Sequence, residues 1–182
     1  MRERQIVAIF GGPGSGKSTL AKGLVTAARG RGDRVKIIDP GRQFRGGEMP
    51  EDPETWLSDR KNRRDTDLLV ADDADAYVPN TLARQSPWRD LSLRNRWWNL
   101  DVLITARRLQ SLPVVLLSAV STMFVFRLSP ADQAGRDRLI EACGQALTIP
   151  TEPYRFVRVD VFTGQIRHGR TLKAGGFSLE GQ

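Results

Sequence analysis

The sequence has very little cysteine and histidine. Cys143 is the one cysteine and His168 the one histidine among 182 residues. A single cysteine excludes an internal disulfide, and the two residues together cannot supply the ligands of a zinc site built from cysteine and histidine. Neither kind of cross-link is therefore expected to stabilise the fold.

Long apolar runs are also missing. The longest, residues 112–123, contains Pro113 and serines and is shorter than the roughly 18 apolar residues that a membrane-spanning helix needs. The amino-terminal segment places Arg2, Glu3 and Arg4 before an apolar run, without the longer apolar region and cleavage site of a signal peptide. We therefore expect no transmembrane segment and a cytoplasmic location.

The remaining composition is that of a soluble globular chain. Hydrophobic residues make up 40% and charged residues 27% of the sequence, and its length fits one domain, residues 1–182, with a full core. The formal net charge is +7. This charge favours a polyanionic partner such as nucleic acid, but it equally fits a basic surface that serves solubility. Charge alone leaves both interpretations open.

A glycine-rich motif stands between residues 5–10, an apolar run short enough for a buried strand, and residues 20–28, whose apolar side chains have helical spacing. The motif fits the phosphate-binding pattern of a glycine, four free positions, Gly, Lys and then Ser or Thr. Its members are Gly11, Gly12, Pro13, Gly14, Ser15, Gly16, Lys17, Ser18 and Thr19. A glycine-rich turn without a ligand is the simpler alternative.

The residue types of this motif suit a nucleotide for physical reasons. Its glycines let the chain turn tightly and direct several backbone N–H groups at an anion, and the following helix adds the positive end of its dipole. Lys17 supplies a charge for the β and γ phosphates, and the Ser18 hydroxyl is placed to ligate Mg²⁺. We therefore expect ATP and Mg²⁺ as cofactors.

Two adjacent carboxylates follow the apolar strand predicted at residues 68–71. In a domain with a phosphate loop, Asp72 would hold Mg²⁺ through its water shell, and Asp73 would orient or deprotonate the attacking water. A solvated turn residue or a helix cap is the alternative for Asp73.

The rest of the chain alternates between strand and helix patterns, which predicts a mostly parallel sheet with helices on both faces and a C-terminal β-hairpin. Thr105 and Arg107 lie near the carboxyl end of one strand, where open α/β sheets bind ligands, and Thr105 is predicted to sense the γ-phosphate. The predicted strands are 34–40, 101–108 and 121–128, the hairpin is 154–172, the helices are 54–60, 80–98, 113–120 and 129–143, and residues 173–182 form a loose tail.

Residues 41–64 form an irregular basic insertion, and long irregular stretches in compact domains are usually functional or mobile. Its cationic side chains would contact DNA phosphates without reading the base sequence, and a solvated basic surface is the alternative. They are Arg42, Arg45, Arg60, Lys61, Arg63 and Arg64. Trp97 and Trp98 point about 100° apart if they are helical, so either one of them lies at a subunit interface or both pack in the core and at its rim.

The order of these parts resembles the FtsK/HerA superfamily of P-loop ATPases, DNA-pumping motors that include viral genome-packaging ATPases. The resemblance covers about residues 5–145. It is carried by residues 11–19, Asp39-Pro40-Gly41, residues 68–79, and the stretch from 103–108 through 124–128 to Asp132-Gln133.

The chain departs from the pattern of that superfamily in three ways. Asp73 stands where the superfamily usually has Glu, and Ala106 stands where it commonly has Gln. From its length we also expect it to be without the membrane anchor, the DNA-reading winged module and the accessory barrel of larger members. Its small size resembles the viral packaging ATPases most.

The resemblance implies a RecA/HerA-like P-loop NTPase that couples ATP hydrolysis to DNA translocation and packages a viral genome into a capsid. It further implies a homohexameric ring with ATP between subunits, in which Arg107 or Arg127 of a neighbour stabilises the transferring phosphoryl group. Double-stranded DNA in a channel lined by the 41–64 insertion and a capsid or portal-vertex protein are the implied partners. The implied location is the host cytoplasm or the virion.

Two other functions stay open. A small-molecule kinase on the same phosphate loop would use residues 41–64 as a lid, although Asp72, Asp73 and Thr105 favour water as the phosphoryl acceptor. A nucleotide-dependent virion assembly or secretion ATPase, or a switch protein, would organise a complex without pumping DNA.

Overall fold

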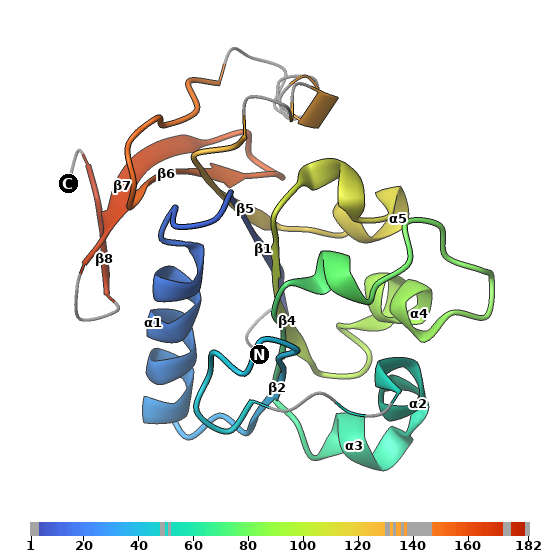
Figure 1. Cartoon of the computed structure of the whole chain (residues 1–182). Coiled ribbons are helices and arrows are strands. Elements are labelled where there is room, and N and C mark those ends of the chain that lie inside the picture. Colours follow the sequence, from blue (N-terminus) through green and yellow to red (C-terminus); the bar gives the residue numbers. More distant parts are fainter. Residues whose placement is uncertain are drawn as a thin grey trace.

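A computed structural model shows the chain as an α/β fold (Figure 1) and describes residues 4–47, 50, 52–129, 132, 134, 135, 137, 147–172 and 176–180. Its strands are β1 (Ile6–Phe10), β2 (Val35–Ile38), β3 (Leu68–Ala71), β4 (Asp101–Ala106), β5 (Thr122–Phe126), β6 (Arg155–Asp160), β7 (Ile166–Thr171) and β8 (Phe177–Leu179). Its α-helices are α1 (Lys17–Gly30), α2 (Pro53–Ser58), α3 (Arg60–Arg64), α4 (Pro87–Arg94) and α5 (Val114–Leu117), with 3-10 turns η1 (Ala74–Ala76) and η2 (Leu109–Ser111).

The described strands form one sheet in the order β2-β3-β4-β1-β5-β6-β7-β8. Strands β1 to β5 run parallel to one another, and β6, β7 and β8 add antiparallel pairs. Every residue of β4 and β5 is buried, as expected for strands of a sheet that is covered on both faces. The carboxyl ends of β3, β4, β1 and β5 therefore meet at one edge of the sheet.

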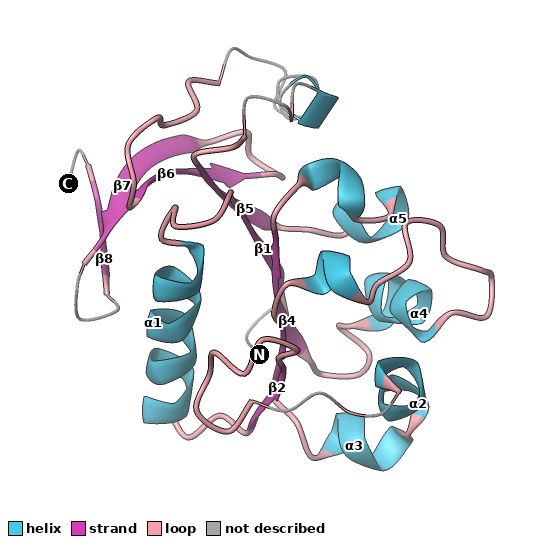
Figure 2. Ribbon diagram, in the orientation of Figure 1, coloured by secondary structure: helices cyan, strands magenta, loops and turns pink. Residues whose placement is uncertain are grey.

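Helices cover both faces of the sheet (Figure 2), which confirms the predicted fold class. Helix α1 packs Leu20 and Val25 onto one face, in a cluster with Ile9 of β1. On the other face, Trp88 of α4 and Leu116 of α5 pack in a second cluster with further strand residues. Within the described part of the chain, no helix is long and apolar enough to cross a membrane.

The segment predicted as a loose tail contributes a strand. Phe177 begins β8, which pairs with β7 at the end of the sheet. Its ring centroid lies 6.0 Å from those of Phe124 and Phe156, and aromatic contacts of this kind stabilise a short strand beyond its burial. The tail prediction was wrong for residues 177–179 because a three-residue strand has too little periodicity to recognise.

The predicted helix at 80–98 is shorter in the structure, because α4 begins at Pro87. Proline lacks an N–H group and is favoured in the first turn of a helix. The helix predicted at 54–60 corresponds to α2, which ends at Ser58, and a second short helix, α3, follows it. Asp52 and Asp59 accept hydrogen bonds at the starts of these two helices. Most of the helix predicted after Ser129, including Leu139, Ile140 and Cys143, lies outside the described residues.

Candidate nucleotide-binding site

The loop between β1 and α1 is fixed to the ends of the two neighbouring strands. Gly11 N donates to Ala106 O at 3.3 Å, and Gly12 N donates to Arg127 O at 2.9 Å. A Cβ atom on Gly11 would lie 2.6 Å from Ser15 Oγ and 2.7 Å from Phe126 Cβ. The loop thus packs too tightly against β5 to accept a side chain at this glycine.

Helix α1 begins directly after the loop, with Gly16 as its N-cap in the left-handed conformation (φ 106°). A residue with a Cβ is disfavoured at such a φ. The first turn of this described helix contains no acidic residue, so no carboxylate of its own neutralises the positive end of its dipole. An anion is favoured at that end.

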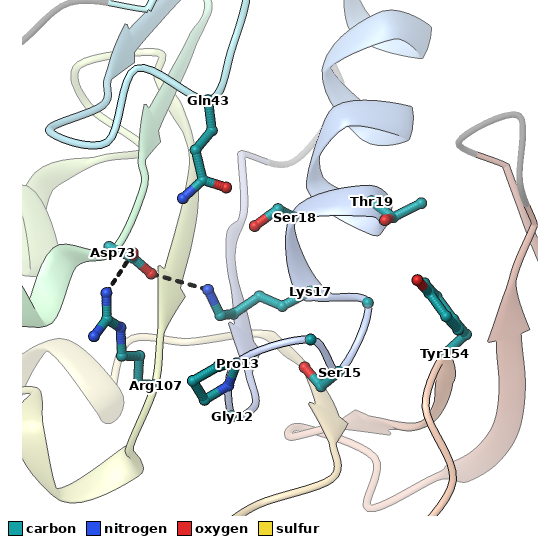
Figure 3. Close-up of a pocket in the computed structure, with 12 residues that line it drawn as sticks. Gly12, Pro13, Ser15, Lys17, Ser18, Thr19, Gln43, Asp73, Arg107 and Tyr154 are labelled. Carbon is teal, nitrogen blue, oxygen red and sulfur yellow. Dashed lines mark hydrogen bonds and ion pairs between the residues drawn. The ribbon is translucent and has the colours of Figure 1, made fainter.

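A cavity of about 560 Å³ opens over the loop (Figure 3). Its lining comes from the loop and the start of α1, and from side chains beyond β2, β3 and β4 and before β6. The lining residues are Gly12, Pro13, Gly14, Ser15, Gly16, Lys17, Ser18, Thr19, Gln43, Asp73, Arg107 and Tyr154. The structure therefore brings the phosphate loop, one of the two predicted carboxylates and one of the two predicted arginines to one cavity.

Asp73 lies between two cations in this cavity (Figure 3). Lys17 Nζ donates to Asp73 Oδ1 at 2.9 Å, and Arg107 donates to Asp73 Oδ2 at 3.2 Å. Burial raises the pKa of the Asp73 carboxyl, but the hydrogen bond and charge of Lys17, followed by those of Arg107, outweigh it and lower the pKa overall. The hydrogen bond to Asp73 in turn raises the pKa of Arg107. Asp73 is consequently an anion that is already paired before any phosphate enters.

Thr105, at the middle of the sheet, contacts the Asp72 carboxylate and the Asp73 backbone. Its hydroxyl donates to Asp72 Oδ1 at 2.6 Å and accepts from Asp73 N at 2.8 Å. Thr105 is fully buried and is not among the residues that line the cavity. In this structure its single proton is used on Asp72, and contact with a γ-phosphate stays a prediction.

Asp72 is fully buried, and burial raises the pKa of its carboxyl. Among the described residues, no hydrogen-bond donor reaches its Oδ2 atom. A buried acceptor without a donor costs free energy, and a hydrated cation near this atom would supply a partner. The predicted ligands fit Mg²⁺ by their chemistry, since both the unpartnered Asp72 oxygen and the Ser18 hydroxyl are oxygen groups; Ser18 lines the cavity and Asp72 does not.

The described residues contain no group of three or more His, Cys, Asp or Glu side chains that could enclose a metal ion.

The two predicted arginines occupy different positions. The Arg107 side chain is 60% exposed and pairs with Asp73 of its own chain. Arg127 follows β5; its carbonyl anchors the phosphate loop, and its exposed side chain is not part of the cavity lining. Of these two arginines, Arg107 lines the cavity of its own chain and Arg127 does not.

The basic insertion does not form one surface. Phe44 packs in the cluster on the α1 face of the sheet, whereas Leu57 packs in the cluster on the opposite face. The insertion thus crosses the sheet edge formed by β2. Arg42 and Arg45 are consequently separated from Arg60, Lys61, Arg63 and Arg64.

The second group of arginines lies beside the two adjacent tryptophans. A hollow of about 380 Å³, here called the Arg–Trp patch, is lined by Arg60, Arg63, Arg64, Arg94, Trp97 and Trp98. The Arg63 guanidinium lies 4.2 Å from the centre of the Trp98 ring, and Arg63 also donates to the carbonyls of Leu57 and Ser58. Trp98 packs against the core, while Trp97 is 87% exposed. None of the described residues that line this patch is acidic.

Two cavity residues have no signal in the sequence. Gln43 reaches the cavity because Asp39 Oδ2 accepts from Phe44 N at 2.7 Å and so orders the turn after β2. Tyr154 reaches it from the start of the C-terminal hairpin. No periodicity or motif marks either residue, since both depend on contacts between segments far apart in the chain.

Residues 2–77 match the family model described as methylmalonyl Co-A mutase-associated GTPase MeaB. This segment contains the phosphate loop and the two carboxylates. A search of curated proteins found no match.

Several solved structures share the fold. The genome packaging NTPase B204 from Sulfolobus turreted icosahedral virus 2, in complex with AMPPCP, is 17% identical, with a TM-score of 0.74 over 92% of this chain and 98% of that one. The N-terminal domain of zonular occludens toxin from Neisseria meningitidis is 12% identical, with a TM-score of 0.60 over 96% and 97%. EssC (ATPases 2 and 3) from Geobacillus thermodenitrificans is 16% identical, with a TM-score of 0.60 over 86% of this chain and 37% of that one.

These similarities confirm the resemblance drawn from the sequence at the level of the fold. In this chain the phosphate loop follows β1 and the two adjacent carboxylates follow β3 of the parallel part of the sheet. The chain therefore has the fold of the P-loop NTPases.

Proposed function

We propose that this chain is a Mg²⁺-dependent ATPase that uses the cavity over the phosphate loop. The observation that carries the proposal is the meeting of Lys17, Asp73 and Arg107 at the start of α1, in a cavity of about 560 Å³. A cation for the phosphates and a carboxylate for water are the groups that phosphoryl transfer to water requires.

In the proposed reaction, the triphosphate competes with Asp73 for Lys17. When Lys17 turns to the phosphates, Asp73 loses the stronger of the two cationic contacts that lower its pKa. Its carboxylate then becomes more basic and is free to orient or deprotonate the attacking water. Arg107 keeps Asp73 in place during this exchange. Mg²⁺, when held by Ser18 and through water by Asp72, would neutralise charge on the phosphates.

Phosphate release from ATP with Mg²⁺ tests this proposal. Lys17→Ala should lose hydrolysis and weaken ATP binding, whereas Lys22→Ala, on the same helix but outside the cavity lining, should retain both. Asp73→Asn should lose about a hundredfold or more in turnover, the usual contribution of a general base, while it still binds ATP. Chelation of Mg²⁺ should stop hydrolysis reversibly. Hydrolysis by Lys17→Ala at the wild-type rate would refute the assignment of the ATPase site to this cavity.

We further propose that Arg127 acts across a subunit interface, in a homohexameric ring. Its exposed side chain follows β5 and is not part of the cavity lining of its own chain. An arginine supplied by a neighbour typically contributes about a thousandfold or more in rate. Arg107, which already contacts Asp73, would act within its own subunit.

Mixing two inactive variants separates these roles. Lys17→Ala and Arg127→Ala should each be inactive, and their mixture should regain hydrolysis, because some interfaces then combine an intact phosphate loop with an intact Arg127. A mixture of Lys17→Ala with Arg107→Ala should stay inactive. Recovery in the second mixture but not in the first would reverse the assignment.

We also propose that hydrolysis drives the movement of double-stranded DNA, as in the packaging of a viral genome, with a capsid or portal-vertex protein as docking partner and the host cytoplasm or virion as location. The fold is shared with a protein named a genome packaging NTPase. The Arg–Trp patch supports a polyanionic partner, since four arginines line it and its described lining contains no carboxylate.

The DNA proposal is tested by ATPase stimulation and by DNA binding over a range of salt concentrations. Arg60→Glu with Arg64→Glu is the informative variant, because Arg63 is committed to carbonyls of α2. Arg84→Glu with Arg170→Glu makes the same charge change at other exposed positions. Only the first variant should weaken DNA binding and flatten its salt dependence. Equal effects of the two variants would mean that the patch contributes only to the overall positive charge and is not a specific DNA-binding surface.

An ATPase that assembles a virion or secretion complex without pumping is the second candidate. Hydrolysis that depends on Lys17 but does not respond to DNA, together with DNA binding that the patch variant leaves unchanged, would favour it.

A further inference from the structure

Tyr154 stands immediately before β6 and is fixed to the phosphate loop by its backbone. Its N–H donates to Ser15 O at 2.7 Å, and its carbonyl accepts from Thr171 N at 2.8 Å. The residue therefore ties the C-terminal hairpin to the loop between β1 and α1. The tie places one aromatic side chain in the lining of the nucleotide cavity.

The conformation of Tyr154 is unusual for a residue with a large side chain. Its φ is +64°, in the left-handed region, where a side chain costs conformational energy that the surrounding contacts must offset. The ring is nevertheless not buried, since the residue is 53% exposed. Core packing thus does not explain why the chain holds this aromatic ring here.

The ring rests against the start of α1. A Cβ atom on Gly16 would lie 2.9 Å from Tyr154 Cδ1 and 3.2 Å from Phe126 Cε1, so the edge of the ring sits directly on the loop backbone. Ser15 and Gly16 on one side and the hairpin on the other limit the space available to the ring. The same residue lines the cavity.

The cavity has two chemically different ends (Figure 3). Asp73, Arg107 and the Lys17 ammonium lie at one end, while Tyr154 lies at the other, beside Thr19. Phosphates bound on the loop with the γ-phosphate near Lys17 would direct the rest of the nucleotide toward Tyr154. The polar end suits the reacting phosphate, and the aromatic end suits a flat apolar group.

We propose that Tyr154 is the platform on which the nucleobase of the bound nucleotide stacks. The proposal rests on the proposed ATPase function and adds the residue that binds the base. Stacking of a base on an aromatic side chain typically changes affinity by about tenfold to a hundredfold. The phenol hydroxyl is not required for stacking, so phenylalanine should replace tyrosine without loss.

The test compares a ligand that has a base with one that has none. Dissociation constants for ATP and for inorganic tripolyphosphate are measured by calorimetry with Mg²⁺, for wild type, Tyr154→Phe and Tyr154→Leu. Tyr154→Phe should bind both ligands within about twofold of wild type. Tyr154→Leu should bind ATP about tenfold or more weakly and tripolyphosphate as wild type does. Thermal unfolding of each variant checks that the fold is intact.

A second variant keeps the test independent of the leucine substitution. In Tyr154→Trp, ATP should quench the fluorescence of the new indole and tripolyphosphate should not. The unsubstituted chain gives the fluorescence change of the other tryptophans. Equal weakening of both ligands by Tyr154→Leu would make Tyr154 a brace of the loop and overturn the stacking role, as would unchanged binding of ATP. If Lys17→Ala weakens neither ligand, the nucleotide site itself fails, and the stacking role fails with it.

Discussion

Replacing Thr105 with valine removes one hydroxyl that contacts both of the aspartates that follow β3. Valine has nearly the shape of threonine, so the substitution leaves the packing of β4 intact. The lost group donates to Asp72 Oδ1 at 2.6 Å and accepts from Asp73 N at 2.8 Å. Both partners lie in the buried part of the sheet edge, where water cannot readily replace the hydroxyl.

The loss of unfolding free energy in Thr105→Val follows from these two contacts. A hydrogen bond to a charged group contributes about 1.5–3 kcal/mol, and a buried N–H without an acceptor costs about 1–3 kcal/mol. Because the two contacts share one hydroxyl and are not additive, we expect a loss of about 3 kcal/mol. For a chain of this length, each kcal/mol lowers the unfolding temperature by about 2–4 °C, which gives about 6–12 °C.

The loss should also depend on pH. Burial already raises the pKa of Asp72, and the Thr105 hydroxyl opposes that rise, so the pKa should be higher still in Thr105→Val. A carboxyl whose pKa is raised by folding is stabilising when protonated, and this contribution is lost as the pH rises through the folded-state pKa. The difference between wild type and variant should therefore be smaller in mildly acidic buffer than at pH 8.

Calorimetric unfolding at the two pH values measures both effects. Thr105→Ser is the matched control, since it keeps the hydroxyl and loses one methyl group, at a cost of about 1 kcal/mol. The reasoning would be refuted if Thr105→Val unfolded within about 2 °C of wild type. It would also be refuted if Thr105→Ser unfolded at a lower temperature than Thr105→Val.

Two further predictions follow from single contacts. The pKa of Asp67 is lowered to about 2, chiefly by its hydrogen bond with Arg34, so the ionised carboxylate stabilises the fold at pH values above its unfolded pKa of about 3.9. Urea titrations should therefore show that Asp67→Asn is less stable than wild type at pH 7. The difference in unfolding free energy between the two should shrink as the pH falls from about 4 to about 2. Gly16→Ala should lower the unfolding temperature and the ATP affinity more than Gly14→Ala does. Both glycines have a positive φ, but a Cβ atom would meet Tyr154 at Gly16 and no atom within 4 Å at Gly14. Equal effects of the two substitutions in calorimetry would contradict the close contact.

The sequence determined the elements of the site that are local in the chain. Residues 11–19 specify a turn, an anion-binding helix start and a lysine within one continuous segment, so their spacing alone predicts the loop and its place between β1 and α1. Apolar strands that end in Asp72 or in Thr105 indicated a parallel sheet with polar groups at one edge, since carboxyl ends of parallel strands meet there. These inferences need no knowledge of contacts between distant segments.

Tertiary structure alone decided which side chains meet at that edge. Pairing of β3 with β4 brings the Thr105 hydroxyl to the Asp72 carboxylate and the Asp73 backbone N–H, and the position of β1 next to β4 lets Lys17 and Arg107 share Asp73. The antiparallel pairing of β6 with β5 carries Tyr154 to the phosphate loop. The β2 edge divides the basic insertion between two faces. Strand order is set by packing between segments far apart in the chain, which leaves no periodic trace in any one of them.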